Sequence, residues 1–268
     1  MASPYALFKW IYTHWPEGAM DFAQLAIAAV VPAFAFAAYR ARFTNMRGAV
    51  AGLLIAWALD AAGLAVFAVF LFFFVSASLL TRLRGSWKAQ RGLKDVAGRS
   101  ITQVVGVGTP MALFALLYMA GVRPALTATV VAIAIATADT WASEVGVAYG
   151  GRPRLITKPW IQVEPGTSGG VTPAGTLASL AGAAAVAFLS YPLLDVNPYV
   201  VWGLGFAGDV LDSVVGAVAQ RKFFCGADMY DEPRCPNYRT SGYLTNEAVN
   251  LIVEASLGLA YILAMLYL

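Results

Sequence analysis

Long apolar runs of membrane-spanning length follow one another along almost the whole chain, and they restrict its fold more than any other feature. The runs are 22–39, 48–80, 101–120, 125–148, 168–191, 199–219 and 246–268. A helix needs about 20 apolar residues to cross a bilayer. The runs are continuous, which disfavours a β-barrel because its strands alternate apolar and polar residues. With 59% hydrophobic and only 12% charged residues, the chain is predicted to be an all-α, polytopic helical membrane protein with one transmembrane domain, 1–268.

The run 48–80 is too long for one span and short for two. We interpret Asp60-Ala61-Ala62-Gly63 as a turn between two short helices, which gives about eight transmembrane helices, some of them short or broken. The positive-inside rule supports this turn, because with two helices in 48–80 the four basic loops all fall on one side of the membrane. These loops are 40–47, 81–99, 149–166 and 220–245, and they hold 16 of the 18 Lys and Arg residues. We therefore predict that this side is cytoplasmic and that both termini lie outside.

Carboxylates and amides interrupt three of the runs near their predicted cytoplasmic ends. Asp139-Thr140-Trp141-Ala142-Ser143-Glu144 lies near the end of the fifth span, and Asp209 and Asp212 share one helical face of the seventh. In the eighth span Asn246, Asn250 and Glu254 repeat at four-residue steps. Charges inside a span cost roughly 2.5–3.5 kcal/mol on insertion scales and usually have a function. Each of these three spans thus carries a stripe of polar residues. The alternative interpretation is that the three stripes only form hydrogen bonds between helices.

Several carboxylates gathered in one place repel one another and need cations. Oxygen ligands suit Mg²⁺, which proteins hold with one or two carboxylates plus the phosphates of a substrate. We therefore predict metal ligands on the fifth and seventh spans. These are Asp139, Glu144, Asp209 and Asp212.

Glycines and hydroxyl residues precede the sixth span, in Pro165-Gly166-Thr167-Ser168-Gly169-Gly170-Val171-Thr172. At a helix N-terminus such residues form an anion site from backbone N–H groups and the helix dipole. A flexible loop leading into the span is the alternative, and the Walker A ending is absent. Basic residues on the same side strengthen the phosphate-binding interpretation, although topology and anionic lipid explain most of those in 81–99. The predicted nucleotide-binding residues are Lys88, Arg154, Lys158, Gly166, Thr167, Ser168, Gly169, Gly170, Asn246 and Asn250.

The remaining reactive side chains offer no competing chemistry. The sole histidine, His14, falls on the opposite predicted side, and no Ser/His/Asp or Cys/His arrangement can be assembled. Cys225 and Cys235 lack the two further N or S ligands of a zinc site, which leaves a disulfide staple or free thiols. No basic-aromatic nucleic-acid motif is present.

These residues resemble those of a known integral-membrane family, which contains transmembrane protein 19 and the phytyl-phosphate kinase of plants and cyanobacteria. The resemblance covers about residues 40–255, and the stretches 139–146 and 165–172 are its most specific parts. The other matching segments are 72–74, 76–81, Gly98-Arg99, Gln103-Val104, 153–157, Asp212-Ser213, Gly216, Gln220, Asn246-Glu247 and Val249-Asn250. It implies a CTP-dependent kinase that converts a polyprenyl monophosphate into the diphosphate, distantly similar to dolichol kinase and the CDP-diacylglycerol synthases.

We therefore expect Mg²⁺-dependent transfer of the γ-phosphoryl group of CTP to a membrane isoprenyl monophosphate, such as phytyl, farnesyl or geranylgeranyl phosphate. The predicted catalytic residues are Asp139, Glu144, Asp212 and Arg99. The expected partners are the nucleotide triphosphate, the isoprenyl phosphate lipid and the membrane, without nucleic acid. The alternatives are a cytidylyltransferase that forms a CDP-lipid, a cation-coupled transporter and a non-catalytic lipid-binding scaffold.

Overall fold

The structure is a computed structural model that describes residues 30–82, 98–226 and 228–267. The start of the first predicted span, His14, Lys88 and most of the basic loop 81–99 lie outside these residues. The described helices are Val30–Arg40, α3 (Met46–Ala61), α4 (Leu64–Thr81), α6 (Ile101–Met119), α7 (Ala125–Tyr149), α8 (Pro173–Leu194), α9 (Pro198–Ala219) and α10 (Asn246–Tyr267). Within the described part of the chain, six of them, α4 and α6 to α10, are long and apolar enough to cross a membrane. The helical membrane fold is thus confirmed.

The turn predicted inside the run 48–80 is present. α3 ends at Ala61 and α4 begins at Leu64. Between them Gly63 has φ +138°, a conformation that side-chain-bearing residues rarely adopt. The 16 residues of α3 reach only about 24 Å at 1.5 Å per residue, so this helix is shorter than a typical span.

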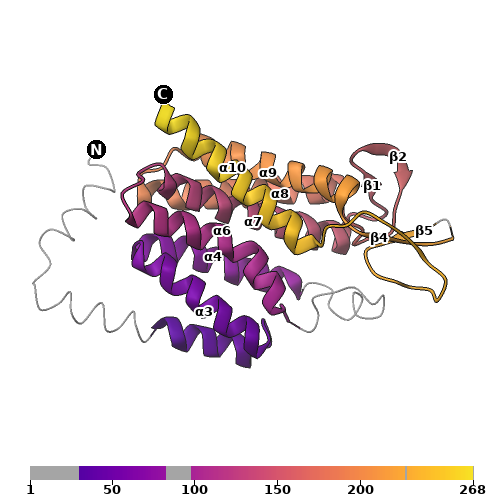
Figure 1. Cartoon of the computed structure of the whole chain (residues 1–268), viewed down its shortest axis with the longest axis horizontal. Helices are drawn as coiled ribbons and strands as arrows, with labels where there is room; N and C mark the ends of the chain where they lie inside the picture. The colour runs from indigo at the N-terminus through magenta and orange to yellow at the C-terminus, as the bar shows by residue number, and fades with distance from the viewer. Residues whose placement is uncertain (1–29, 83–97, 227, 268) are drawn as a thin grey trace, which may run out of the picture.

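α7 lies at the centre of the bundle, and α4, α6, α8, α9 and α10 all pack against it (Figure 1). Its residues 128–138 are buried on every side, most of them alanine, valine or isoleucine. Small residues allow close helix contacts where lipid supplies no hydrophobic driving force. A Cβ atom on Gly175 of α8 would lie 2.9 Å from the carbonyl oxygen of Ala142, and one on Gly205 of α9 2.8 Å from the Cβ of Ala134. These two glycines therefore set how closely α8 and α9 approach α7.

Two small antiparallel sheets occupy one end of the bundle, and the sequence did not predict them (Figure 1). The first has the order β2-β1-β3, and the second β5-β4-β6. Their strands are β1 (Arg154–Leu155), β2 (Lys158–Gln162), β3 (Gly170–Val171), β4 (Lys222–Cys225), β5 (Asp228–Tyr230) and β6 (Arg239–Ser241). The C-terminal end of α10 lies at the other end of the bundle. The loops 149–166 and 220–245 thus share one end, which we call the strand end.

The sixth span begins later than predicted, at Pro173 instead of Ser168. The reason is local, because Gly170 and Val171 pair with β1. Thr172 then caps the helix, accepting a hydrogen bond from the Gly175 N–H at 3.0 Å, and Pro173 occupies the first turn, where its missing N–H costs nothing. The glycine-rich stretch is therefore a strand and loop packed beside the helix.

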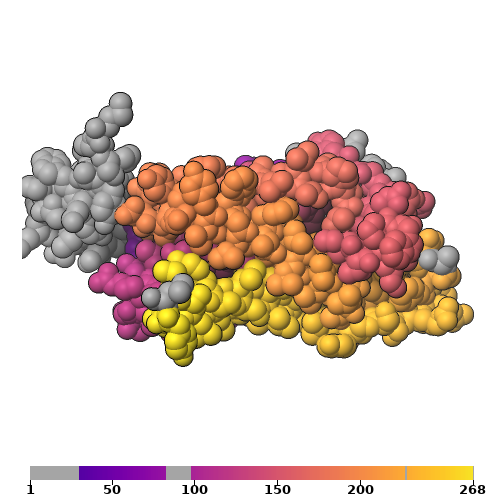
Figure 2. Space-filling view, turned by 90° about the horizontal axis from the view of Figure 1, so that it is seen from above, coloured from indigo at the N-terminus to yellow at the C-terminus, as the bar shows by residue number. Residues whose placement is uncertain are grey.

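The outer face of the bundle is apolar. Figure 2 shows α8 and α9, in orange tones, beside α10, in yellow, along one long side of the molecule. Large side chains on these helices are exposed, among them Leu177, Phe188, Val218 and Leu263. Exposed apolar side chains on helices of spanning length are expected to contact lipid.

Candidate functional site

The carboxylates of α7 lie in the half of the helix that is nearer the strand end, with Asp139 just past the middle and Glu144 five residues further on. Asp139, Thr140, Ser143 and Glu144 all line a cavity of about 610 Å³. Asp139 is half-buried, at the point where the fully buried part of α7 ends. The polar stripe of the fifth span therefore faces this cavity.

The polar stripe of α9 faces α7. Its buried residues include Gly205, Gly208, Asp209, Asp212 and Gly216, as expected for one helical face. Because the glycines allow close contact with α7, Asp209 and Asp212 interact electrostatically with Asp139. Both aspartates lie outside the described lining of the cavity, so they form an inner layer of carboxyl groups behind it.

A serine on α8 supports this inner layer, and sequence reasoning missed it. Ser179, which is fully buried, donates a hydrogen bond to Asp209 Oδ2 at 2.6 Å. A hydroxyl-to-carboxylate bond of this length is charge-assisted and strong. The available signal was a polar residue alone in an apolar run, of the kind that already singled out the other spans.

α10 contributes the third stripe. The side-chain amide nitrogen of Asn250, oriented toward its two acceptors, donates to Asp212 Oδ2 at 2.9 Å and to the backbone oxygen of Asn246 at 3.1 Å. One turn further on, Glu254 is 1% exposed and interacts electrostatically with Asp212 and Asp139. Its Oε2 has no hydrogen-bond partner among the described residues. α7, α9 and α10 thus bring their carboxylates together, as predicted.

The donor set fits a hard divalent cation that a substrate helps to bind. Across the described ranges, no three Asp, Glu, His or Cys side chains already form a metal-binding group. Mg²⁺ does not need such a cage, because it commonly uses one or two carboxylates and completes its shell with phosphates and water. A buried carboxylate oxygen without a partner, on Glu254, is costly unless a cation or proton compensates it. Asp139 and Glu144 line the cavity and are the residues that would hold such an ion.

The cavity has two chemically different parts. Its polar part, at the strand end, includes Arg99, Gln103, Arg221 and Arg234 as well as the α7 carboxylates. Its apolar part continues between the helix Val30–Arg40, α3, α4 and α6. Such a shape suits an amphiphile with an anionic head and a long apolar chain.

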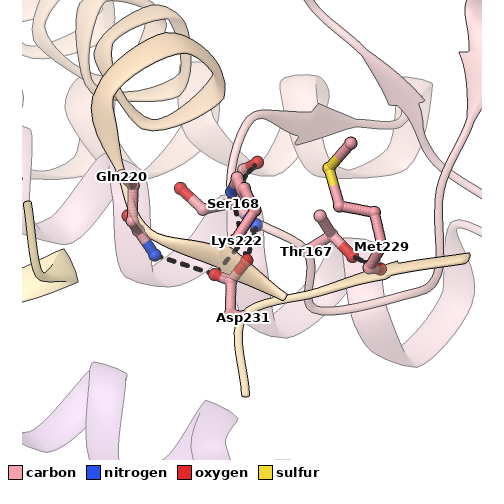
Figure 3. A network of polar contacts seen from close by, with 6 residues as sticks. All are labelled: Thr167, Ser168, Gln220, Lys222, Met229 and Asp231. Carbon is pink, nitrogen blue, oxygen red and sulfur yellow. Dashed lines mark hydrogen bonds and ion pairs between the residues drawn. The ribbon is translucent and has the colours of Figure 1, made fainter. Parts of the chain in front are cut away.

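Asp231 fixes the glycine-rich loop in place (Figure 3). Its carboxylate accepts hydrogen bonds from the Ser168 N–H at 3.0 and 3.1 Å and from Gln220 Nε2 at 2.8 Å. Lys222 Nζ forms an ion pair with it at 3.1 Å and donates to the Ser168 carbonyl at 2.6 Å. Sequence reasoning missed Asp231 and counted Lys222 only as a basic loop residue.

The ammonium group of Lys222 is almost completely buried, with 3% of its side chain exposed. Burial lowers the pKa of Lys222, and the opposing influence of Asp231 partly offsets the shift. The network therefore depends on the aspartate charge, because an unpaired buried ammonium is strongly disfavoured.

The predicted phosphate-binding residues divide into two groups. Gly166, Thr167, Asn246 and Asn250 line the cavity, as does Arg99. The others stand outside its described lining, and Lys88 lies outside the described residues. They are Arg154, Lys158, Ser168, Gly169 and Gly170. Arg154 and Lys158 are exposed on β1 and β2, and Arg154 Nη1 donates to the Pro159 carbonyl at 2.7 Å.

The two cysteines form a disulfide, Cys225–Cys235, so the staple is the correct one of the two alternatives. The bond joins β4 to the segment after β5. Asp231 and Arg234, which line the cavity, lie within the closed ring. The disulfide thus restrains one wall of the polar part of the cavity.

Spanning helices around a shared cluster of carboxylates, with a polar and an apolar cavity part, define a polytopic integral membrane protein with an amphiphile-sized site. The chain belongs to the integral membrane protein family DUF92, whose model matches residues 29–258. It is similar to Protein PGR of Arabidopsis thaliana, 31% identical over 256 residues, covering 81% of this chain and 88% of that protein. The family resemblance inferred from the motifs is thereby confirmed.

Two microbial membrane proteins are also similar to the chain. One, from Methanocaldococcus jannaschii, is 36% identical over 182 residues, covering 67% of this chain and 68% of its own. The other, from Synechocystis, is 33% identical over 211 residues, covering 75% and 73%. No solved structure matches the chain.

Proposed function

We propose that the protein transfers the γ-phosphoryl group of CTP to an isoprenyl monophosphate in the membrane, in a reaction that needs Mg²⁺. One observation carries this proposal: carboxylates from three helices gather beside a cavity that is basic and polar at one end and apolar at the other. The choice of CTP and of an isoprenyl acceptor rests on the family resemblance.

Each part of the cavity has a role in this reaction. Asp139 and Glu144 would hold Mg²⁺, which, when bound, neutralises the charge of the reacting phosphates. Arg99 would bind phosphate oxygens, and Asp212, held by Asn250, would keep the inner layer negative and so attract the cation. Phosphoryl transfer needs mainly such positioning and charge neutralisation.

The chemistry asks little else of the protein. A phosphate oxygen of the acceptor bonds to the γ-phosphorus while the bond from that phosphorus to the bridging oxygen breaks. CDP then leaves and the isoprenyl diphosphate remains. The attacking oxygen already carries negative charge, so no strong general base is required. A role for Arg154 and Lys158 would require the nucleotide to extend over β1 and β2.

Product analysis tests the proposal and separates it from a cytidylyltransferase. Purified protein in detergent is given labelled CTP, Mg²⁺ and a panel of isoprenyl monophosphates. We expect CDP and an isoprenyl diphosphate, whereas a cytidylyltransferase would give pyrophosphate and a CDP-lipid. Asp212→Asn should abolish turnover, while Asp60→Asn, at the far end of α3, should retain it. Absence of transfer to every acceptor would refute the kinase.

We also propose that the strand end faces the cytoplasm, because its loops carry most of the basic residues. The disulfide in the same region argues for the opposite side, since disulfides are rare in cytosolic proteins. A cysteine introduced at exposed Thr157, in a protein without Cys225 and Cys235, can be labelled in intact cells with an impermeant thiol reagent. Labelling only after the cells are opened supports the cytoplasmic assignment, and labelling of intact cells overturns it.

A further inference from the structure

The apolar part of the cavity is a channel of limited depth. On α3 its lining extends from Gly48 to Ala56, and on α4 from Thr81 to Phe70. At 1.5 Å per residue these stretches correspond to about 12 and 16 Å. Val31, Ala56 and Phe70, the lining residues farthest from the strand end, are all buried. The apolar chain of a ligand that enters from the polar part therefore meets a closed floor.

Gly52 stands about halfway along this channel, on α3. Among the described residues, a Cβ atom there would have one neighbour within 4 Å, Val104 Cγ1 at 3.8 Å, which is ordinary contact. The other glycines of the channel differ, because a Cβ on Gly48 would meet the Arg99 carbonyl at 3.1 Å and one on Gly108 would collide with Ile55. Helix packing thus explains Gly48 and Gly108 but not Gly52.

A glycine inside a helix lowers its stability relative to alanine. At Gly52 no packing contact with the part of the chain that the structure describes requires that cost. What the missing side chain leaves instead is open space within the channel, on the path from the polar part to the floor. A larger side chain would project into this space and shorten the channel to its outer half.

We propose that Gly52 determines the length of the apolar chain that the site accepts. The occupant is the isoprenyl chain of the monophosphate acceptor, so the inference rests on the proposed function. Two features favour this occupant over a neutral lipid: the channel is continuous with the polar part of the cavity, and Arg99, Arg221 and Arg234 stand at that end. An anionic head would bind there while its chain fills the channel.

The test compares acceptors that differ only in chain length. Full-length wild type, Gly52→Ala and Gly52→Leu are assayed in detergent with geranyl, farnesyl and geranylgeranyl monophosphate. For Gly52→Leu we expect kcat/KM with the longest acceptor to fall at least about tenfold relative to the shortest, since single methylenes in apolar pockets have effects of this order. Gly52→Ala should have a smaller effect in the same direction.

The matched control is Gly203→Leu, because Gly203 is an exposed glycine within α9 and a Cβ there would meet no described residue within 4 Å. It should leave the ratio between acceptors unchanged. If Gly52→Leu lowers activity by one factor for all three acceptors, the residue supports the structure only and the inference is overturned.

A binding measurement separates this inference from the proposed function. Native mass spectrometry without nucleotide records which monophosphates each variant retains. Wild type that retains all three while Gly52→Leu loses the longest supports the inference, even if no phosphate is transferred and the kinase proposal fails. Phosphate transfer by both proteins with identical chain-length preference retains the kinase and overturns the role of Gly52.

Discussion

Replacing Asp231 by asparagine should release the glycine-rich loop from the second sheet. The substitution keeps the shape of the side chain but removes its charge. Lys222, with 3% of its side chain exposed, would then lose the negative charge beside it and have only neutral oxygens, such as the Ser168 carbonyl at 2.6 Å, to accept its hydrogen bonds among the described residues. The Ser168 N–H, which donates to the charged Asp231 carboxylate, would then donate to a neutral amide oxygen. We expect the loop 165–171 to open far more often.

The magnitude follows from the burial of the ion pair. Removing one partner of a fully buried pair costs about 3–5 kcal/mol. The Asp231 side chain is 20% exposed, so water compensates part of the loss, and we expect about 2–3 kcal/mol. Since 1.4 kcal/mol corresponds to a factor of ten, local opening should increase about 30- to 150-fold.

The exposed pair Arg152–Glu164 supplies the control. Its N–O distance is shorter, 2.7 Å against 3.1 Å, but its side chains are 63% and 33% exposed. Exposed pairs contribute only about 0–1 kcal/mol, so Glu164→Gln should change opening less than about fivefold.

Hydrogen exchange of the peptide that covers 165–171, followed by mass spectrometry in detergent, measures both variants. Equal protection in Asp231→Asn and wild type would refute the reasoning. A larger loss in Glu164→Gln than in Asp231→Asn would show that distance, and not burial, governs these pairs.

Three further changes have defined outcomes. Gly205→Ala should lower the free energy of unfolding in detergent by about 1–3 kcal/mol through overpacking against α7, whereas Gly203→Ala should leave it equal or slightly higher; equal losses would contradict the packing. Glu254→Gln should weaken stabilisation by Mg²⁺ with CTP, because it removes a buried carboxylate oxygen that a cation can compensate; an unchanged Mg²⁺ response excludes that role. Replacing Cys225 and Cys235 by serine should lower the local stability of this loop by about 2–3 kcal/mol relative to the oxidised wild type. Faster proteolysis between the two positions measures the loss, and the reduced wild type should be cleaved as fast as the variant.

The helical layout could be predicted because hydropathy and charge act on whole segments. The turn near Gly63 followed from two independent demands, the length of a span and the position of the basic loops. Both demands act on many residues at once, so single irregular positions do not obscure them. Helix bounds agreed closely except at α8, where the pairing of β3 with β1 delays the start.

The gathering of the carboxylates was predictable in part. Three-residue spacing placed Asp209 and Asp212 on one helical face, and four-residue spacing placed Asn250 and Glu254 on one face of another helix. The rotation of each helix about its axis was not predictable, because close contacts such as Gly205 against α7 decide it. The rotations of α7 and α9 place Asp139 and Glu144 in the cavity wall and leave Asp209 and Asp212 behind it.

The strand end could not be derived from the sequence. Its strands are two to five residues long, too short for a periodic pattern. The partners in its main network, Ser168 and Asp231, are 63 residues apart, and nothing local to either residue indicates the other. Only the contact with Asp231 and Ser168 shows that Lys222 has a structural role in addition to its effect on membrane orientation.

The burial of α7 on every side also bears on how the protein is made. A nascent chain that ends after α7 would expose Asp139 and Glu144 to hydrocarbon, at an energetic cost. α8 follows next in the chain and packs closely along α7 through Gly175. We therefore expect the two helices to leave the insertion machinery as a hairpin, and chains truncated between them to be removed by membrane quality control.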